Sequence, residues 1–151
     1  CSQAPAPTAL RPLSFGAADY DYAASLAGYS DGVYVVGETR GALHKGPTGG
    51  LGYNGFIRKY ATSGELVWGR QFGTRGDEVG SRVATDAGDN AYVVGSTQGD
   101  MGAEEAEIYD PVGRDYDVFL RKYTPAGTVA WTRQLGRYGF RDLANGVVTY
   151  G

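Results

Sequence analysis

The sequence predicts an all-β protein, and three observations support this class. Residues 68–73 (WGRQFG) return as residues 131–136 (WTRQLG), so strand-like segments recur at a period of 63 residues (131 − 68). The 25 glycines supply turns, and the aromatic residues, 13% of the chain and mostly tyrosine, favour half-buried strands. No apolar stripe of helical period continues for three turns without meeting a glycine.

Two further segments recur and define the repeat. Residues 56–60 (FIRKY) return as residues 119–123 (FLRKY), again at a period of 63 (119 − 56). Residues 33–39 (VYVVGET) return as residues 91–97 (AYVVGST) at a period of 58 (91 − 33). The second copy therefore has five additional residues (63 − 58) between this segment and the next one.

Alternation and turn residues predict the elements of each copy in order. The second copy should contain strands over residues 79–86, 91–97, 118–124 and 128–136, with turns at 87–90 (AGDN) and 124–127 (TPAG). The first copy should contain a strand around residues 22–27, strand segments at 33–39, 56–60 and 68–73, and turns at 29–32 and 62–64.

Four strands joined in this way form one blade of a β-propeller. We expect two full blades with partial flanking blades, arranged as a tether over residues 1–12 and a repeat region over 13–151. Blade one should cover about residues 17–72 and blade two about 77–135. Residues 13–16 (LSFG) stand where WGRQFG and WTRQLG stand later, and residues 142–151 align with the start of a third blade.

Two blades are fewer than the roughly four to eight of a closed propeller, and their outer strand edges would lack partners. Three explanations stay open. The chain is part of a longer array, which the alignment of its last residues with a first strand favours; several copies assemble into a ring; or an open arc docks on a partner protein.

The repeated segments resemble the bacterial SBBP β-propeller repeat. The residues that carry the resemblance are Trp68, Arg70, Gln71, Phe72, Gly73, Thr74, Asp77, Asp86, Gly88 or Asp89, Asn90, Tyr92, Gly95, Asp117, Phe119, Lys122, Tyr123, Gly127 and Trp131. The resemblance implies an extracytoplasmic, often surface-associated propeller whose biochemical role is generally unassigned. The first copy departs from the pattern because it lacks the leading tryptophan, and the second copy has a long, acidic connector before Asp117.

The only cysteine, Cys1, is followed by Ser2 and a proline-punctuated stretch to about Pro12. A mature bacterial lipoprotein begins with the cysteine that carries its lipid and continues into such a tether, so we expect lipidation at Cys1. An arbitrary boundary is the alternative. The expected location is extracytoplasmic and membrane-anchored, at the outer membrane or cell surface, because Ser2 resembles the sorting signal for the outer membrane.

The composition and charge of the chain limit the classes of partner that we expect. A net charge of −3 and a pI near 5.1 argue against nucleic acid, which requires a clustered basic face. No apolar run approaches the roughly 20 residues that a membrane-spanning helix needs. The expected partners are the membrane through the N-terminal lipid, an envelope protein or further propeller blades, and other copies of the chain.

Residues shared by the two copies are expected to be structural, with Trp68 and Trp131 packed between blades. Functional residues are expected where the copies differ. In a meander of four strands, the long loops at 40–55, 74–78, 97–117 and 137–142 should converge on one face. The candidate binding residues of this face are His44, Lys45, Arg75, Asp77, Tyr138 and Arg141.

The loop at 97–117 is rich in carboxylates, which suit Ca²⁺ with its roughly six to eight oxygen ligands. The candidate ligands are Asp100, Glu104, Glu105, Asp110, Asp115 and Asp117. Their spacing matches neither an EF-hand nor a nonapeptide calcium motif, so a solvated charged loop is the alternative. No other cofactor is expected.

Catalytic motifs do not occur in the sequence. His44 is the only histidine and has no identifiable nucleophile partner, and no G-x-S-x-G sequence is present. We expect a lipid-anchored cell-envelope module that serves as a protein–protein interaction or structural scaffold, and not an enzyme. The alternatives are an accessory subunit of an outer-membrane assembly and a propeller enzyme, either a quinone-dependent dehydrogenase or a calcium-assisted polysaccharide-active protein.

Overall fold

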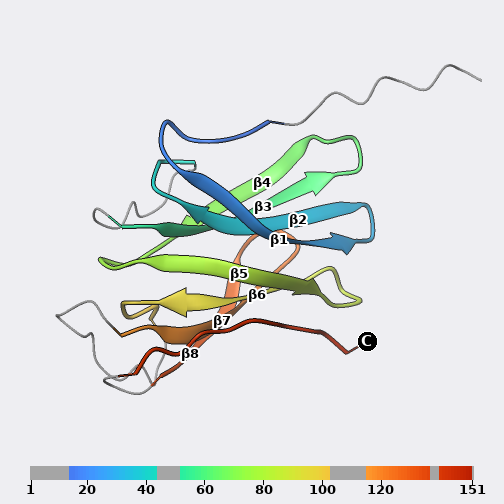
Figure 1. The fold of residues 1–151 in the computed structure, drawn as a ribbon. Helices are drawn as coiled ribbons and strands as arrows, with labels where there is room; N and C mark the ends of the chain where they lie inside the picture. Colours follow the sequence, from blue (N-terminus) through green and yellow to red (C-terminus); the bar gives the residue numbers. More distant parts are fainter. Residues whose placement is uncertain (1–13, 44–51, 103–114, 137–139, 151) are drawn as a thin grey trace, which may run out of the picture.

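The computed structural model describes residues 14–43, 52–102, 115–136 and 140–150. They form two four-stranded antiparallel sheets, in each of which the strand order follows the chain (Figure 1). Blade one contains β1 (Asp21–Tyr29), β2 (Gly32–Thr39), β3 (Asn54–Ala61) and β4 (Leu66–Phe72). Blade two contains β5 (Glu78–Thr85), β6 (Ala91–Thr97), β7 (Asp117–Tyr123) and β8 (Val129–Leu135). The all-β class and the four-stranded blades are confirmed.

The observed strands of the second copy agree closely with the predicted ones, and β6 has the predicted bounds. The hairpins β3–β4 and β7–β8 end in glycines with left-handed backbone, Gly64 at φ 84° and Gly127 at φ 79°. Each glycine amide donates a hydrogen bond to the carbonyl three residues earlier, on Ala61 (2.8 Å) and Thr124 (2.9 Å). Glycine is favoured there because other residues rarely adopt positive φ. Within the described ranges no helix is long and apolar enough to cross a membrane.

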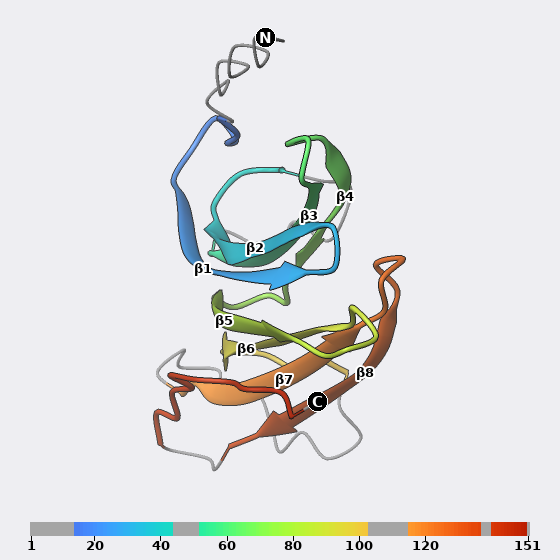
Figure 2. The ribbon, with the colours of Figure 1, turned by 90° about the vertical axis from the view of Figure 1, so that its right-hand side faces the viewer.

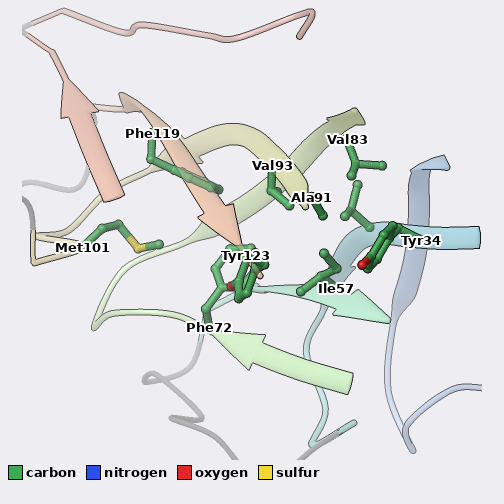
Figure 3. Close-up of a cluster of buried hydrophobic side chains, with 10 residues drawn as sticks. Tyr34, Ile57, Phe72, Val83, Ala91, Val93, Met101, Phe119 and Tyr123 are labelled. Carbon is green, nitrogen blue, oxygen red and sulfur yellow. The ribbon is translucent and has the colours of Figure 1, made fainter. Parts of the chain in front are cut away.

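The two blades pack with β5 against β1, β2 and β3 of blade one (Figure 2). Their shared core contains Tyr34, Ile57 and Phe72 of blade one, together with Phe119 and Tyr123 of blade two (Figure 3). Phe72 and Phe119 meet edge to face, with ring centroids 5.6 Å apart. Such aromatic pairs stabilise a core beyond the effect of their buried area.

Phe15 repeats this contact on the opposite face of blade one. Its ring lies edge to face on Phe56 at 5.9 Å, and the guanidinium of Arg58 covers it at 4.2 Å. Phe72 of blade one makes the same pair of contacts with blade two. Its ring lies edge to face on Phe119, and the guanidinium of Arg121 lies 5.3 Å from it. Residues 14–20 form no strand, yet Phe15 occupies the position that the alignment of LSFG with WGRQFG predicts.

Residues 142–150 also form no strand, but their hydrogen bonds repeat those of β5. The Thr85 hydroxyl donates to the carbonyl of Gly28 at 2.6 Å, and the Thr149 hydroxyl donates to the carbonyl of Thr85. The amide of Asp142 donates to the carbonyl of Tyr116 at 2.6 Å. This segment therefore lies against blade two much as β5 lies against blade one, while a third blade remains a prediction.

Asp86 organises the β5–β6 turn. Its carboxylate accepts hydrogen bonds from the amides of Gly88 and Asn90, from the Asn90 side chain and from the Tyr92 hydroxyl at 2.9–3.0 Å. The ammonium of Lys122 lies 3.5 Å away. Partial burial favours a higher pKa for Asp86, but the hydrogen bonds from Asn90, Tyr92 and Gly88 outweigh it and lower this pKa to about 2.

We expect Asp86→Ala to lower the free energy of unfolding by about 1–2 kcal/mol at neutral pH, because several turn donors lose their acceptor. The folded-state pKa is depressed below 3.8, so the contribution of Asp86 is complete above that pH and is lost as the pH falls toward about 2. Urea unfolding between pH 2 and pH 7 checks both effects. Asp86→Asn should retain part of the stability without this acid dependence; an unchanged acid dependence would contradict the assignment.

Candidate binding face

The loops β2–β3, β4–β5 and β6–β7 leave the sheets at the same end, opposite the hairpins (Figure 1). Their described residues contact one another around Asp77 of the β4–β5 loop. One carboxylate oxygen of Asp77 accepts from the amide of Tyr53 at 2.8 Å, and the other accepts from the Tyr116 hydroxyl at 3.3 Å. The backbone of Asp77 exchanges hydrogen bonds of 3.0 Å with Gln98. Asp77, a predicted face residue, therefore joins three loops.

The surroundings of Asp77 are charged and aromatic. Burial raises the pKa of Glu38, and the neighbouring charge of Asp77 raises it further. Burial also raises the pKa of Tyr116, again with a contribution from Asp77. The guanidinium of Arg141, another predicted face residue, lies 5.0 Å from the Tyr116 ring centre, which is within the range of a cation–π contact. The described part of the face thus combines carboxylates with a stacked cation.

Arg40 forms a second stack beside the first. Its guanidinium lies 4.2 Å from the ring centre of Tyr53, and Tyr20 meets the same ring edge to face at 5.5 Å. Arg75 is exposed on the β4–β5 loop, as the sequence predicts. Arg40 and Tyr53 belong to the loop 40–55 that was predicted to lie on this face, but neither they nor Tyr20 were named as candidate binding residues, because the sequence does not reveal which arginine and tyrosine side chains meet.

Two glutamines of the repeated R-Q segment hold the long loops. The Gln71 side chain accepts from the amide of Leu43 and donates to the carbonyl of Gly41, both at 3.0 Å. Gln134 accepts from the amide of Met101 at 2.9 Å and donates to the carbonyl of Gly99 at 3.1 Å. Each glutamine is buried in its blade. The start of each long loop is therefore fixed by a side chain of the adjacent outer strand.

Glu78 is a further fully buried polar residue that the sequence did not single out. Its carboxylate accepts from the amide of Thr74 at 2.7 Å, from the Thr74 hydroxyl and from the Thr97 hydroxyl at 3.0 Å. Burial raises the pKa of Glu78, although these hydrogen bonds oppose the effect. Asp21 holds the same position in blade one and accepts from the amide of Ala17 at 2.6 Å. The sequence signal that could have identified this buried carboxylate is the acidic residue at the start of both inner strands, Asp21 in β1 and Glu78 in β5.

The predicted calcium ligands that the structure describes have protein partners. Asp100 accepts from the amide of Gly102 at 2.7 Å, and Asp117 accepts from the Gln134 side chain at 2.7 Å. Asp115 is buried, and burial raises the pKa of Asp117, with Gln134 opposing and Asp115 adding to the shift. In the described ranges no group of three or more His, Cys, Asp or Glu side chains is arranged to hold a metal ion.

Several predicted residues lie outside the described residues. They are Cys1, His44, Lys45, Glu104, Glu105, Asp110 and Tyr138. The calcium site and the binding role of His44 and Lys45 therefore remain predictions. The described members of the face, Arg75, Asp77 and Arg141, all lie at the loop end of the blades, where Asp77 links loops and Arg141 stacks on an aromatic ring.

Comparison with known families places one repeat in the chain. The family model described as SBBP, a β-propeller repeat, matches residues 67–100. The matched residues include most of β4, all of β5 and β6, and the start of the β6–β7 loop. The predicted repeat is therefore confirmed for this part of the chain. A search of curated proteins found no match.

Proposed function

We propose that this β-propeller module is a lipid-anchored scaffold of the cell envelope that binds a partner protein through its loop face. The observation that supports this function best is the set of side chains fixing the loops. Asp77, Gln71 and Gln134 are each hydrogen-bonded to the backbone of a loop. Their polar groups therefore hold the described parts of these loops in place, which suits a binding surface on a stable framework.

A fixed surface favours binding because less conformational entropy is lost on association. The stacked arginines add to this effect. Arg40 and Arg141 each lie over a tyrosine ring, so their side chains are ordered before a partner arrives. Arginine and tyrosine are also enriched among the residues that dominate protein–protein binding energies. Exposed carboxylates or polar loops of a partner would suit these cations.

The membrane attachment in this proposal is supported by the sequence around Cys1. This cysteine precedes Ser2 and the proline-punctuated stretch that ends near Pro12. As a lipoprotein tether, this stretch would let the blades reach a partner beside the membrane. We expect Cys1→Ser to move the protein from the membrane fraction to the soluble fraction. An unchanged distribution would contradict lipid attachment at Cys1.

A site-specific photocrosslinking experiment tests the binding role. A photoreactive amino acid at Arg75, which is exposed on the loop face, should give a discrete adduct with one envelope protein. The matched control is Ala87, which is exposed on the β5–β6 hairpin at the opposite end of blade two. A second photoreactive variant carries the label at Arg40. Equal labelling from Arg75 and Ala87, or no adduct from either Arg75 or Arg40, would overturn the loop face as the binding surface.

A further inference from the structure

A groove of about 520 Å³ lies between the two blades, where the end of β4 faces β7, the β7–β8 hairpin and the start of the β6–β7 loop. Part of its apolar lining, formed by Phe72, Met101 and Tyr123, belongs to the shared core (Figure 3). The volume is within the range of about 300–1,000 Å³ that is typical of ligand pockets. We call it the interblade groove, and its lining includes Arg70, Phe72, Asp100, Arg121, Tyr123 and Val129.

Two arginine side chains line the interblade groove, one from each blade. Arg70 of β4 donates through Nε to the carbonyl of Gly127 at 2.9 Å. Arg121 of β7 donates through Nε to the Thr132 hydroxyl at 2.8 Å and through Nη2 to the carbonyl of Met101 at 3.2 Å. These bonds hold both guanidiniums at the groove, and their acceptors are uncharged. Further N–H donors remain on each guanidinium, because an arginine carries more of them than these bonds use.

The two arginines give the groove a positive charge. Within the described ranges neither guanidinium forms an ion pair. The carboxylate that lines the groove, Asp100, is exposed and accepts a hydrogen bond from the amide of Gly102 at 2.7 Å. Burial raises the pKa of the Tyr123 hydroxyl, although the charges of Arg121 and Arg70 oppose this effect, so the hydroxyl stays protonated. The groove thus combines two ordered cations with a tyrosine and an apolar surface.

The interblade groove also follows the edge of a strand. Residues 70–73 are consecutive and all line it, so the groove runs along the backbone of β4 and its end. β4 is the outermost strand of its sheet, with β3 as its strand partner among the described residues. An extended peptide can add to such an edge through backbone hydrogen bonds, while its alternate side chains point to one side. Val129 is exposed at the groove and offers apolar contact to such a peptide.

We propose that the interblade groove binds an acidic peptide segment of a partner protein, which lies extended along β4 and places a glutamate or aspartate carboxylate between Arg70 and Arg121. The planar guanidinium matches the geometry of a carboxylate, and hydrogen bonds between the two charged groups are stronger than those between neutral ones. The hydrogen bonds that hold the arginines need not break when the carboxylate binds. The groove lies along the sides of the blades, so this site is additional to the loop face and does not depend on the partner of that face.

An NMR titration of the isotopically labelled full chain tests the proposal and detects even weak binding. The probe is a short acetylated and amidated peptide of alternating valine and glutamate, and the matched control peptide carries glutamine in place of glutamate. The glutamate peptide should shift the amide signals of residues 70–73 and 121–123 in a saturable way. Its affinity should fall as the salt concentration rises, because ions screen the attraction. The glutamine peptide should leave these signals unchanged.

Glutarate, a free dicarboxylate, is the second probe and separates a peptide site from a site for a small carboxylate. It should bind much more weakly than the glutamate peptide, because it cannot form backbone hydrogen bonds with the edge of β4. Glutarate that binds as tightly as the peptide would overturn the assignment of a peptide segment as the ligand.

Charge variants test the residues of the groove. Arg70→Gln and Arg121→Gln should each weaken binding of the glutamate peptide by about 10-fold or more, because each removes a charged donor. Asp100→Asn should tighten binding by about 2–5-fold, since it removes the opposing charge and keeps an oxygen that accepts from Gly102. The matched control is Arg82→Gln on β5, which removes an exposed arginine that does not line the groove and should leave binding unchanged.

Circular dichroism and the unfolding temperature establish that each variant is folded. Asp100→Asn keeps the proposal testable if an arginine variant unfolds, because it changes only the charge of an exposed side chain. No binding of the glutamate peptide, equal binding of the glutamine peptide, signal shifts confined to other surfaces, or an affinity that none of the groove variants alters would each overturn the proposal.

Discussion

Trp68→Ala should lower the free energy of unfolding by about 2–3 kcal/mol, less than the loss of a fully buried aromatic side chain, because Trp68 is only partly buried. Trp68 packs on Tyr34 and Tyr123, with ring centroids 5.6 and 6.2 Å away, and its indole donates to the carbonyl of Pro125. The substitution removes apolar contact with both blades and leaves that carbonyl with one donor fewer. The loss falls on the contact that holds the two blades together.

Trp131→Ala is the matched control for this prediction. Trp131 occupies the same position in blade two and packs on Tyr92, but within the described ranges no ring of another blade lies on its other side. Its replacement should cost only about 1 kcal/mol, since among the described residues it has no counterpart of the contacts that Trp68 makes with Tyr123 and Pro125. Urea unfolding of the two variants under the same conditions compares these losses. Equal losses would show that the contact between the blades contributes little to stability.

The strands were predictable because local signals define them. Alternation of apolar residues set the faces of β6 and β7, and Gly127 marked the tight hairpin between β7 and β8. Repetition then supplied the topology, since two copies of the same four strands exclude most other arrangements. Phe15 lies outside the regular strands, yet its alignment with Phe72 predicted its position.

Only the location of the candidate binding face was predictable from the sequence. Loop lengths predicted that Asp77 and Arg141 lie at one end of the blades. They did not predict the hydrogen bond from Tyr116 to Asp77 or the stacking of Arg141 on Tyr116. Such pairings depend on how two blades sit together, and they join residues 25 or more positions apart. Gln71 and Gln134 illustrate the same limit. The repeat identified both glutamines, but their hydrogen bonds to the loop backbone follow from the burial of their side chains, which the sequence does not show.

Glu78→Leu should lower the free energy of unfolding by about 3 kcal/mol. Glu78 is fully buried at the start of β5 and accepts hydrogen bonds from the Thr74 amide and from the hydroxyls of Thr74 and Thr97. Leucine fills a similar volume but leaves the amide and the hydroxyl of Thr74 without this acceptor, at a cost of about 1–3 kcal/mol for each donor that water does not reach. The Thr97 hydroxyl keeps the carbonyl of Gly99 as an acceptor. The matched control is Asp21→Leu, which should cost about 1 kcal/mol because Asp21 accepts from the Ala17 amide in a less buried position.

The pH dependence separates the carboxylate of Glu78 from its role in filling space. Burial raises the folded-state pKa of Glu78 above 4.5, so the folded protein binds this proton at a higher pH than the unfolded chain does. The stability of the unmodified protein should therefore gain from Glu78 as the pH falls through the folded pKa, and Glu78→Leu removes that gain. The difference in unfolding free energy between the two proteins should be larger near pH 4.5 than near pH 8. A difference that shrinks on acidification would mean that the ionised carboxylate is the better acceptor in this buried position and that its hydrogen bonds outweigh its desolvation.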